Sequence, residues 1–412
     1  MKSTSSAAGL LAAFLALSAA PAGASPGSGI RLGGSAGRLH PYLDLEGRYD
    51  SNVYYASESG TTAGDVILHV RPGFQLEVPG ELSSVELAAN LDWAQYLGVE
   101  KSATKDLSRL YAAAALGLTV NRRGAIGVEL DDRFFRDPST SSFVFSGAVI
   151  SNRNDLTLRV PWRPGGGALV ISPTLDWSLE TFEPFSSCSA QSAQTTSCDS
   201  AQLSKLGYND VRAGAEARWK FLPRTSAVLD AGYFSRVPND TSVSQEVSGV
   251  QGRAGFSGLV TPHLGATVKL GYADTLGSTP QSYGTFLATI EGEWLASEST
   301  RVRIGWDHGF GFEPDTVYYL YTSNKIAAAG RWDLAGRYGA KLEAFWERRA
   351  YAFVAGKPSA DSVRVEPGLE AALSRWINAS VAYAYSSRAA SKSTPGFDYT
   401  KHEAWLRFVF TY

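Results

Sequence analysis

The last eight residues of the chain, Trp405-Leu-Arg-Phe-Val-Phe-Thr-Tyr412, decide the fold. With the two-residue period of a β-strand, apolar side chains gather on one face of this stretch. That face carries Leu406, Phe408, Phe410 and Tyr412. No further element follows this strand in the sequence. We therefore expect its apolar face to be covered by lipid or by a distant part of the chain.

This closing strand resembles the last strand of bacterial outer-membrane β-barrels, which ends in an aromatic residue with other aromatics at alternate positions before it. The resemblance implies that Phe408, Phe410 and Tyr412 form the signal read by the barrel-assembly machinery, and that the apolar face meets outer-membrane lipid. The alternative is the closing strand of a soluble β-sandwich.

The first residues have the features of a secretory signal peptide. One positive charge near Met1 is followed by an apolar run at 7–20, too short to span a membrane, and by the small residues Ala22-Gly-Ala24. Because this cleavage region has no cysteine, we do not expect a lipoprotein. We predict a signal peptide at 1–24, a flexible periplasmic lead-in at 25–38 and one outer-membrane β-barrel at 39–412.

The composition favours an all-β membrane protein. Hydrophobic residues make up 44% of the chain and aromatic residues 12%, with 41 Gly and only one Met. A mean hydropathy of -0.12 is compatible with a barrel, since a barrel distributes its apolar residues by alternation and not in runs. A net charge of -2 gives no reason to expect nucleic acid as a partner.

The two cysteines, Cys188 and Cys198, lie in a polar stretch rich in Ser, Gln and Thr. In an exported protein we expect them to form one disulfide bond within a surface loop. A metal site would need more ligands than this loop offers, so we expect no metal and no cofactor.

About 18 segments of roughly ten residues alternate between apolar and polar side chains, as in a single-chain bacterial barrel. In the second segment, for example, Val66, Leu68 and Val70 share one face while His69 and Arg71 share the other. We predict an antiparallel up-and-down barrel with strands at 42–53, 65–78, 85–96, 108–120, 125–134, 150–160, 169–182, 208–221, 227–236, 247–260, 266–274, 283–294, 302–310, 321–332, 340–347, 363–371, 379–385 and 403–412.

The links between these segments alternate in length. Short turn-like links occur at 79–84, 121–124, 161–167, 222–225, 261–265, 296–300, 333–339 and 374–378. Longer polar links occur at 56–64, 98–107, 135–149, 183–207, 237–246, 275–282, 311–320, 348–362 and 386–402. In a barrel with both ends in the periplasm, the short links are periplasmic turns and the long ones are extracellular loops.

Aromatic residues gather near the ends of the predicted strands. Such side chains suit the lipid headgroup level, so we interpret most of them as interfacial girdles. This set comprises Tyr54, Tyr55, Phe134, Trp162, Trp219, Phe221, Trp294, Trp306, Trp332, Trp376 and Tyr385. Stacking on sugars fits only inward or loop aromatics, namely Tyr111, Phe345 and Trp405.

Strand parity also predicts which charged residues line the lumen. They are Asp44, Glu46, Arg48, Arg71, Asp92, Arg109, Glu129, Arg133, Arg153, Arg212, Glu216, Arg253, Lys269, Glu291, Glu293, Arg301, Arg303, Lys341, Glu343, Arg364, Glu366 and Arg407. Both signs are interleaved, which predicts a wet lumen without strong selection for cations or anions. The simpler interpretation is that most of these charges pair across neighbouring strands and solvate the interior.

Catalysis is the alternative from another class, because some outer-membrane barrels are hydrolases. The chain has only five histidines, and no G-x-S-x-G or H-E-x-x-H motif occurs. His40 is expected to precede the first strand, and only His69 is expected in the lumen. We therefore predict that the protein is not an enzyme.

Three short stretches carry a family resemblance: Arg48-Tyr-Asp-Ser-Asn-Val-Tyr54, Lys220-Phe-Leu-Pro-Arg-Thr-Ser226 and Leu259-Val-Thr-Pro-His-Leu-Gly265. With them the chain resembles the β-barrel porin family associated with exopolysaccharide and capsule gene clusters. The resemblance implies an 18-stranded conduit in the bacterial outer membrane for a secreted polysaccharide, acting with a periplasmic polysaccharide export protein. A general solute porin, or a barrel that anchors a surface or motility complex, shares most of these features.

Overall fold

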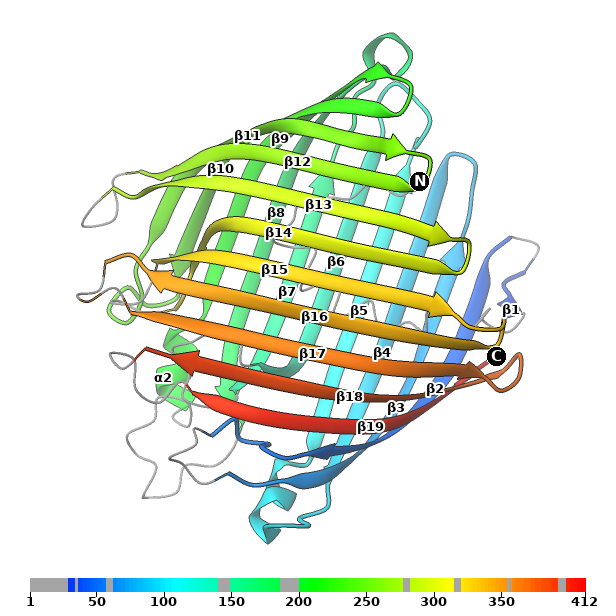
Figure 1. Cartoon of the computed structure of the whole chain (residues 1–412), viewed down its shortest axis with the longest axis vertical. Coiled ribbons are helices and arrows are strands. Elements are labelled where there is room, and N and C mark those ends of the chain that lie inside the picture. The colour runs from blue at the N-terminus through cyan, green and yellow to red at the C-terminus, as the bar shows by residue number, and fades with distance from the viewer. Residues whose placement is uncertain are drawn as a thin grey trace.

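One antiparallel sheet, rolled up and closed on itself, makes up nearly all of the structure (Figure 1). The computed structural model describes residues 29–33, 36–56, 62–139, 149–185, 200–276, 282–314, 320–353, 356, 358–391 and 398–412. Eighteen strands form the barrel wall, and a two-residue strand β1 (Ile30–Arg31) is added to the edge of β2.

The wall strands have the following bounds: β2 (Arg38–Asp50), β3 (Asp65–Val78), β4 (Ser83–Tyr96), β5 (Arg109–Val120), β6 (Val128–Ser139), β7 (Val149–Arg159), β8 (Leu169–Pro184), β9 (Tyr208–Leu222), β10 (Thr225–Pro238), β11 (Val247–Thr261), β12 (Leu264–Thr275), β13 (Gly284–Ser297), β14 (Thr300–Phe312), β15 (Leu320–Asp333), β16 (Tyr338–Tyr351), β17 (Ser359–Ala372), β18 (Ile377–Ala390) and β19 (Tyr399–Thr411). Each pairs antiparallel with the next one along the chain.

The barrel closes where the last strand meets the first. β19 pairs with β2 over nine residue pairs, from Glu403 with Asp50 to Thr411 with Tyr42. Figure 1 shows red β19 beside blue β2 at this seam. Closure removes both edges of the sheet, so the wall has no unpaired edge strand to leave in lipid.

The prediction of a closed antiparallel barrel of about 18 strands is confirmed, and each predicted segment corresponds to one wall strand. The segment at 65–78 has the same bounds as β3. Several strands are longer than predicted at the end with the long loops. β16 runs to Tyr351 and β18 to Ala390, because backbone pairing continues through residues that are polar on both faces.

Two details at the beginning of the chain differ from expectation. The first wall strand begins at Arg38 and not at 42, so His40 lies inside β2 and is buried. The expectation that His40 precedes the first strand is therefore wrong. Within the segment predicted as a flexible lead-in, Ile30 and Arg31 pair with Leu39 and Arg38 of β2. Residues 1–28 lie outside the described residues.

Short helical segments lie in three of the links, within their described residues. A 3-10 helix η1 (Ser102–Leu107) and a short helix α2 (Ser200–Lys205) lie in two of the long links, and η2 (Pro164–Gly166) lies in a short one. Among the described residues, no helix is long and apolar enough to cross a membrane.

The outer face of the wall is apolar. Leu406, Trp93 and Ile304, for example, expose 49%, 57% and 57% of their surface. An apolar exterior around a closed barrel is the arrangement that spans a bilayer, because neighbouring strands pair their backbone groups within the sheet. In such barrels the short turns face the periplasm and the long loops face outward, and the two ends of this barrel are named accordingly below.

Candidate functional site: the lumen and its extracellular constriction

The interior face carries the charged side chains. Along each strand they alternate with the exposed apolar residues of the outer face, as Arg407 alternates with Leu406 and Phe408 on β19. All the charged residues assigned to the lumen by parity lie within wall strands, at positions opposite to the exposed apolar ones. They are not spread evenly, however, and most belong to a few groups of ion pairs.

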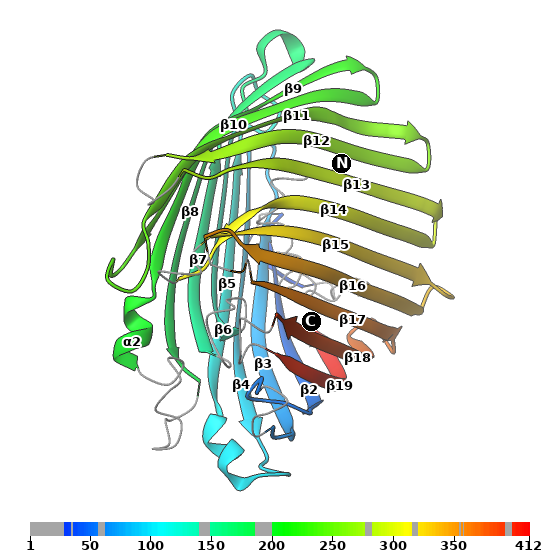
Figure 2. The same cartoon turned by 60° about the vertical axis from the view of Figure 1, so that its left-hand side comes forward.

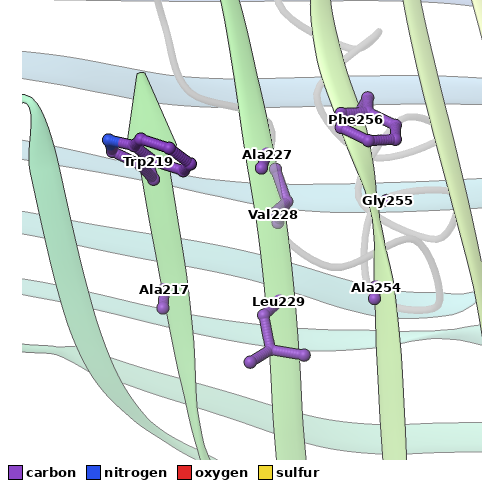
Figure 3. Close-up of a pocket in the computed structure, with 8 residues that line it drawn as sticks. All are labelled: Ala217, Trp219, Ala227, Val228, Leu229, Ala254, Gly255 and Phe256. Carbon is purple, nitrogen blue, oxygen red and sulfur yellow. The ribbon is translucent and has the colours of Figure 1, made fainter. Parts of the chain in front are cut away.

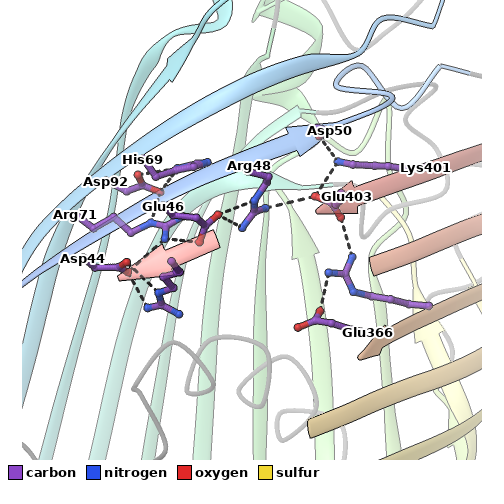
Figure 4. Close-up of polar contacts among 12 residues, drawn as sticks. Asp44, Glu46, Arg48, Asp50, His69, Arg71, Asp92, Glu366, Lys401 and Glu403 are labelled. Carbon is purple, nitrogen blue, oxygen red and sulfur yellow. Dashed lines mark hydrogen bonds and ion pairs between the residues drawn. The ribbon is translucent and has the colours of Figure 1, made fainter. Parts of the chain in front are cut away.

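The largest group bridges the seam between β2 and β19 (Figure 4). We call it the seam cluster, and it comprises Asp44, Glu46, Arg48, Asp50, His69, Arg71, Asp92, Arg364, Glu366, Lys401, Glu403 and Arg407. Its members come from β2, β3, β4, β17 and β19. Acidic and basic groups are almost equal in number, so the cluster carries little net charge.

Alternating signs connect the seam cluster into one network. Arg71 lies 3.3 Å from Asp44, 2.9 Å from Glu46 and 3.0 Å from Asp92. Arg407 of the last strand lies 2.7 Å from Asp44 of the first. These contacts tie the two ends of the barrel sheet together through side chains as well as through backbone hydrogen bonds.

The network continues toward the extracellular end. Arg48 bonds Glu46 at 2.7 Å and lies 3.4 Å from Glu403, which Arg364 approaches to 3.2 Å from the other side. Arg364 also bonds Glu366 at 2.9 Å. Glu366 in turn lies 3.3 Å from Lys341 of β16, so the ion pairs extend along several strands of the wall.

Lys401 holds the extracellular end of the seam. Its Nζ lies 2.7 Å from Asp50 and 3.5 Å from Glu403, and 3.8 Å from the centroid of the Tyr55 ring. Burial raises the pKa of Tyr55, so its phenol stays neutral beside the cation. The side chains of Lys401, Asp50 and Glu403 are only 4–6% exposed.

This arrangement corrects part of the girdle prediction. Tyr54 and Tyr55 pack against the interior cluster that includes Tyr96 and Tyr111, and not on the lipid face. The two residues follow β2 after its pairing has ended, so strand parity no longer applies to them. Other members of the set do lie outside near the short turns, such as Trp219 and Trp294.

A second group of ion pairs lies on β9 to β12. Lys269 bonds Glu216 at 3.1 Å and Asp230 at 3.2 Å, while Arg253 bonds Asp230 at 2.9 Å. Arg218 lies 3.1 Å from Glu216. The group again combines both signs, which leaves no one-sign field on this wall.

The remaining predicted lumen residues fall into two kinds. Those of the first kind have polar partners: Arg109 donates to the Pro184 and Phe185 carbonyls, and Arg153 bonds Asp155 at 2.8 Å. Glu293 lies 3.3 Å from Arg301 and 3.6 Å from Arg303. By contrast, the side chains of five make no hydrogen bond or ion pair with the described residues: Glu129, Arg133, Arg212, Glu291 and Glu343. These five are available to water and solutes.

His69 has no catalytic surroundings among the described residues. Its Nδ1 lies 2.9 Å from Asp92, while its Nε2 is buried and bonds none of them. No described Ser, Thr or Cys hydrogen-bonds this imidazole, so it has no nucleophile to activate. Three or more metal-ligating side chains are nowhere grouped in the described part of the chain.

The extracellular half of the lumen is narrowed by the hairpin of β14 and β15. β14 pairs with β13 only as far as His308 with Ala288, yet it continues to pair with β15 up to Phe312 with Leu320. The end of β14 therefore leaves the wall, as Figure 2 shows. We call residues 309–313 the hairpin tip.

Aromatic contacts show that the hairpin tip lies inside the barrel. The rings of Phe310 and Phe312 lie 5.1 and 5.7 Å from Phe234, an inward residue of β10. Three strands separate β10 from β14 along the wall, so the contact crosses the interior. Gly249 of β11 makes room for it, since a Cβ there would lie 2.3 Å from the Phe234 ring.

Two arginines hold the hairpin tip from opposite sides. Arg236 bonds both oxygens of Asp210 at 2.6 Å and donates to the Phe312 carbonyl at 2.9 Å. From β16, Arg349 bonds Glu313 at 2.8 Å, and Glu313 is 2% exposed. Charge-assisted bonds of this kind are stronger than neutral ones, so the constriction is firmly placed.

The sequence contained one signal for this constriction that strand parity does not use. The segment Gly309-Phe-Gly-Phe312 places two glycines between aromatics at a strand end, where the backbone bends most easily. The prediction ended the strand at 310 and assigned 311–320 to a loop. It could not show that the strand turns inward.

Cys188 and Cys198, predicted to form a disulfide bond, lie outside the described residues. The predicted assembly signal is described. Tyr412 stacks on Trp376 with ring centroids 5.2 Å apart, and its N–H donates to the Pro41 carbonyl at 3.1 Å. Recognition of this signal by the barrel-assembly machinery stays a prediction.

Comparison with known proteins shows likeness in shape and little in sequence. No family model matches the chain, and no curated protein matches its sequence. Among solved structures, the outer membrane protein opdK of Pseudomonas aeruginosa is 12% identical, with a TM-score of 0.46 over 91% of this chain and 99% of that one. OccAB4 of Acinetobacter baumannii is 10% identical, with a TM-score of 0.47 over 91% and 98%.

The siderophore receptor PirA of Pseudomonas aeruginosa is 11% identical, with a TM-score of 0.47 over 92% of this chain and 81% of that one. At this low sequence identity and TM-score, the comparisons indicate no substrate for this chain. The assignment to the outer membrane rests on the closed wall, the even strand number and the apolar exterior. The protein is an integral β-barrel of the bacterial outer membrane with 18 wall strands.

Proposed function

We propose that the barrel is a passive channel for small polar solutes. The observation that carries this proposal is the unequal exposure of the interior side chains along the barrel. Near the periplasmic turns, interior side chains are open to water: those of Arg301 and Glu293 are 63% and 38% exposed. Near the extracellular end, Lys401 and Arg236 are 4% and 8% exposed, because loops and the hairpin tip cover them.

The charges in this lumen support a channel for neutral or weakly charged solutes. Acidic and basic side chains are paired with each other in the seam cluster and on β9 to β12, so neither sign dominates. A polar, wet wall lowers the cost of moving a hydrated solute, while the constriction limits its size.

The test is the size limit of the purified barrel. In liposome swelling with sugars of increasing size, small sugars should enter and larger ones should be excluded. Arg349→Gln, which removes the ion pair to Glu313, should raise the single-channel conductance and the size limit, because the hairpin tip loses one of its two tethers.

The matched control is Arg301→Gln in the open periplasmic half. It should alter ion selectivity slightly and leave the size limit unchanged. Absence of conductance and of swelling in every variant, including one that lacks residues 309–319, would contradict a channel and favour a structural anchor.

Export of a secreted polysaccharide is a second proposal, and interior aromatics support it. Trp405 and Phe345 lie on the interior face, where aromatic rings can stack on sugars. Both rings are already in contact with cations, Arg48 at 5.1 Å and Lys325 at 4.8 Å. A polymer would also have to pass the constriction, so the solute channel is the better-supported function.

Polysaccharide export would involve a periplasmic polysaccharide export protein as partner. A strain that lacks the barrel separates the two proposals. Loss of the surface polymer with normal uptake of small solutes would favour export. Normal surface polymer with slower solute uptake would favour the solute channel.

A further inference from the structure

Asp132 of β6 is a charged residue on the outer face of the wall. It pairs with Leu116 of β5 and with Leu156 of β7, and residues that pair directly in an antiparallel sheet share a face. Its neighbours two positions away, Leu130 and Phe134, lie on that face too, and Phe134 is 37% exposed. The carboxyl group of Asp132 therefore projects toward lipid and not into the lumen.

The depth of Asp132 in the wall distinguishes it from other charged residues on the outer face. It lies seven residues from the extracellular end of β6 and four from the periplasmic end. Every other outward-facing Asp, Glu, Lys or Arg of the described wall strands lies within three residues of an extracellular strand end. These residues are Arg136, Glu183, Asp274, Arg348 and Asp361. A charged group on the lipid face costs most toward the middle of the membrane, so Asp132 is unfavourable there unless another group bonds it.

The barrel itself supplies no such group among the described residues. Oδ1 of Asp132 is shielded from solvent and accepts no hydrogen bond from them. Asn154 of β7, which pairs with Phe134, is the diagonal neighbour of Asp132 on the outer face. The side-chain amide of Asn154 makes no hydrogen bond with the described residues either. An unpaired acceptor and an unpaired donor thus lie side by side on the lipid face.

Hydrocarbon suits other parts of the outer face but not this pair. A hollow of about 410 Å³ across β9, β10 and β11 is lined mainly by apolar side chains such as Trp219, Leu229 and Phe256 (Figure 3). Acyl chains can cover that hollow without loss of a hydrogen bond. They offer no donor to Asp132 and no acceptor to Asn154, whereas a protein surface can supply both.

A second copy of the barrel has the groups that this pair lacks. All copies are inserted in the same direction, so two copies that share one patch are related by a twofold axis along the membrane normal. Asp132 of each copy then meets the Asn154 amide of the other, and the same bond forms twice. Ala112 and Ala114, on the outer face of β5 next to Asp132, are small enough to let the strands of another barrel approach closely.

We propose that the outer face of β5, β6 and β7 around Asp132 and Asn154 is an interface between two copies of the barrel in the membrane. We call it the polar patch. In this interface the carboxyl group of Asp132 accepts a hydrogen bond from the Asn154 amide of the other copy. The interface is independent of what passes through the lumen.

Disulfide cross-linking in outer membranes tests where the copies meet. In a variant that lacks Cys188 and Cys198, Leu156→Cys should give a covalent dimer on mild oxidation, because this position adjoins both Asp132 and Asn154 in the polar patch. Ile304→Cys is the matched control. Ile304 is an exposed apolar residue on the outer face of β14, outside the polar patch, and its cysteine should give no dimer.

Analytical ultracentrifugation of the detergent-purified barrel measures the strength of the interface. Asp132→Leu should raise the dissociation constant of the dimer about 100-fold, since two hydrogen bonds are lost and each contributes roughly a factor of ten. Asp132→Asn keeps an acceptor and should raise the constant less. The isolated Asp132→Leu barrel should also resist urea better than the wild-type monomer, because leucine suits lipid, whereas loss of a purely structural contact would lower its resistance.

Heat-modifiable gel mobility shows that each variant is folded. A cysteine at 156 that forms dimers no better than one at 304 would overturn the interface. Cross-linking of the cysteine at 156 to a different polypeptide would show that another protein covers the polar patch, and would overturn the second copy as its partner. A dimer of unchanged strength in Asp132→Leu would overturn the role of Asp132.

Discussion

The ion pairs of Lys401 make a sharp prediction about barrel closure. Lys401→Met keeps the length of the side chain but removes its charge, leaving Asp50 and Glu403 without their shared cation. Removing one partner of a buried ion pair costs about 3–5 kcal/mol. Glu403 keeps Arg48 and Arg364, while among the described residues Asp50 keeps only the Asn52 N–H. We therefore expect the free energy of unfolding to fall by about 3 kcal/mol, the low end of that range.

Urea unfolding of the barrel in lipid vesicles, followed by tryptophan fluorescence, measures this loss. Glu291→Gln is the matched control, because Glu291 also lies on the interior face but its side chain makes no ion pair or hydrogen bond with the residues that the structure describes. It should change stability by less than about 0.5 kcal/mol.

The double variant Lys401→Met with Asp50→Asn should recover part of the lost stability, since no carboxylate is then left without its cation at that position. A loss below about 1 kcal/mol in Lys401→Met, or a double variant that is as unstable as the sum of the two singles, would refute the role of this lysine at the seam.

Three further predictions concern topology and assembly. A cysteine placed in the link 183–207 of a cysteine-free variant should react with a membrane-impermeant reagent on intact cells, whereas one in the turn 121–124 should not; the opposite labelling would reverse the orientation. Cys188→Ser should leave the amount of heat-modifiable barrel nearly unchanged, because the expected bond closes only a short loop; loss of the folded form would contradict this. Deleting Tyr412 should lower the amount of protein in the outer membrane fraction, measured by immunoblot, since the Trp376 stack and a backbone bond of the closing strand are lost; an unchanged amount would show that assembly does not read this residue.

The sequence was sufficient to predict the wall of the barrel because its signal is local. Leu406 and Phe410 alternate with Arg407 and Val409 whatever the rest of the chain does, and the β3 segment could be delimited in the same way. Strand ends were predicted less well. At Tyr351 and Ala390 the ladder continues above the membrane, where hydrophobic alternation no longer marks it.

The seam cluster and the constriction required information that parity does not contain. Arg407 and Asp44 approach each other only because β19 pairs with β2 in one particular register. Arg236 reaches the Phe312 carbonyl only because β14 leaves the wall. Both contacts join residues far apart in the sequence, and a single sequence gives no direct sign of such pairs.

The point where β14 separates from β13 also determines how deeply the barrel is inserted in its membrane. Above the pair of Ala288 and His308, the β14 side of β13 has no ladder partner among the described residues. Backbone groups without partners cannot lie in hydrocarbon, where each would cost several kcal/mol, but water can hydrogen-bond them. The upper boundary of the hydrocarbon layer therefore lies at or below the level of His308, where Phe286 and Trp306 contact its imidazole at headgroup depth.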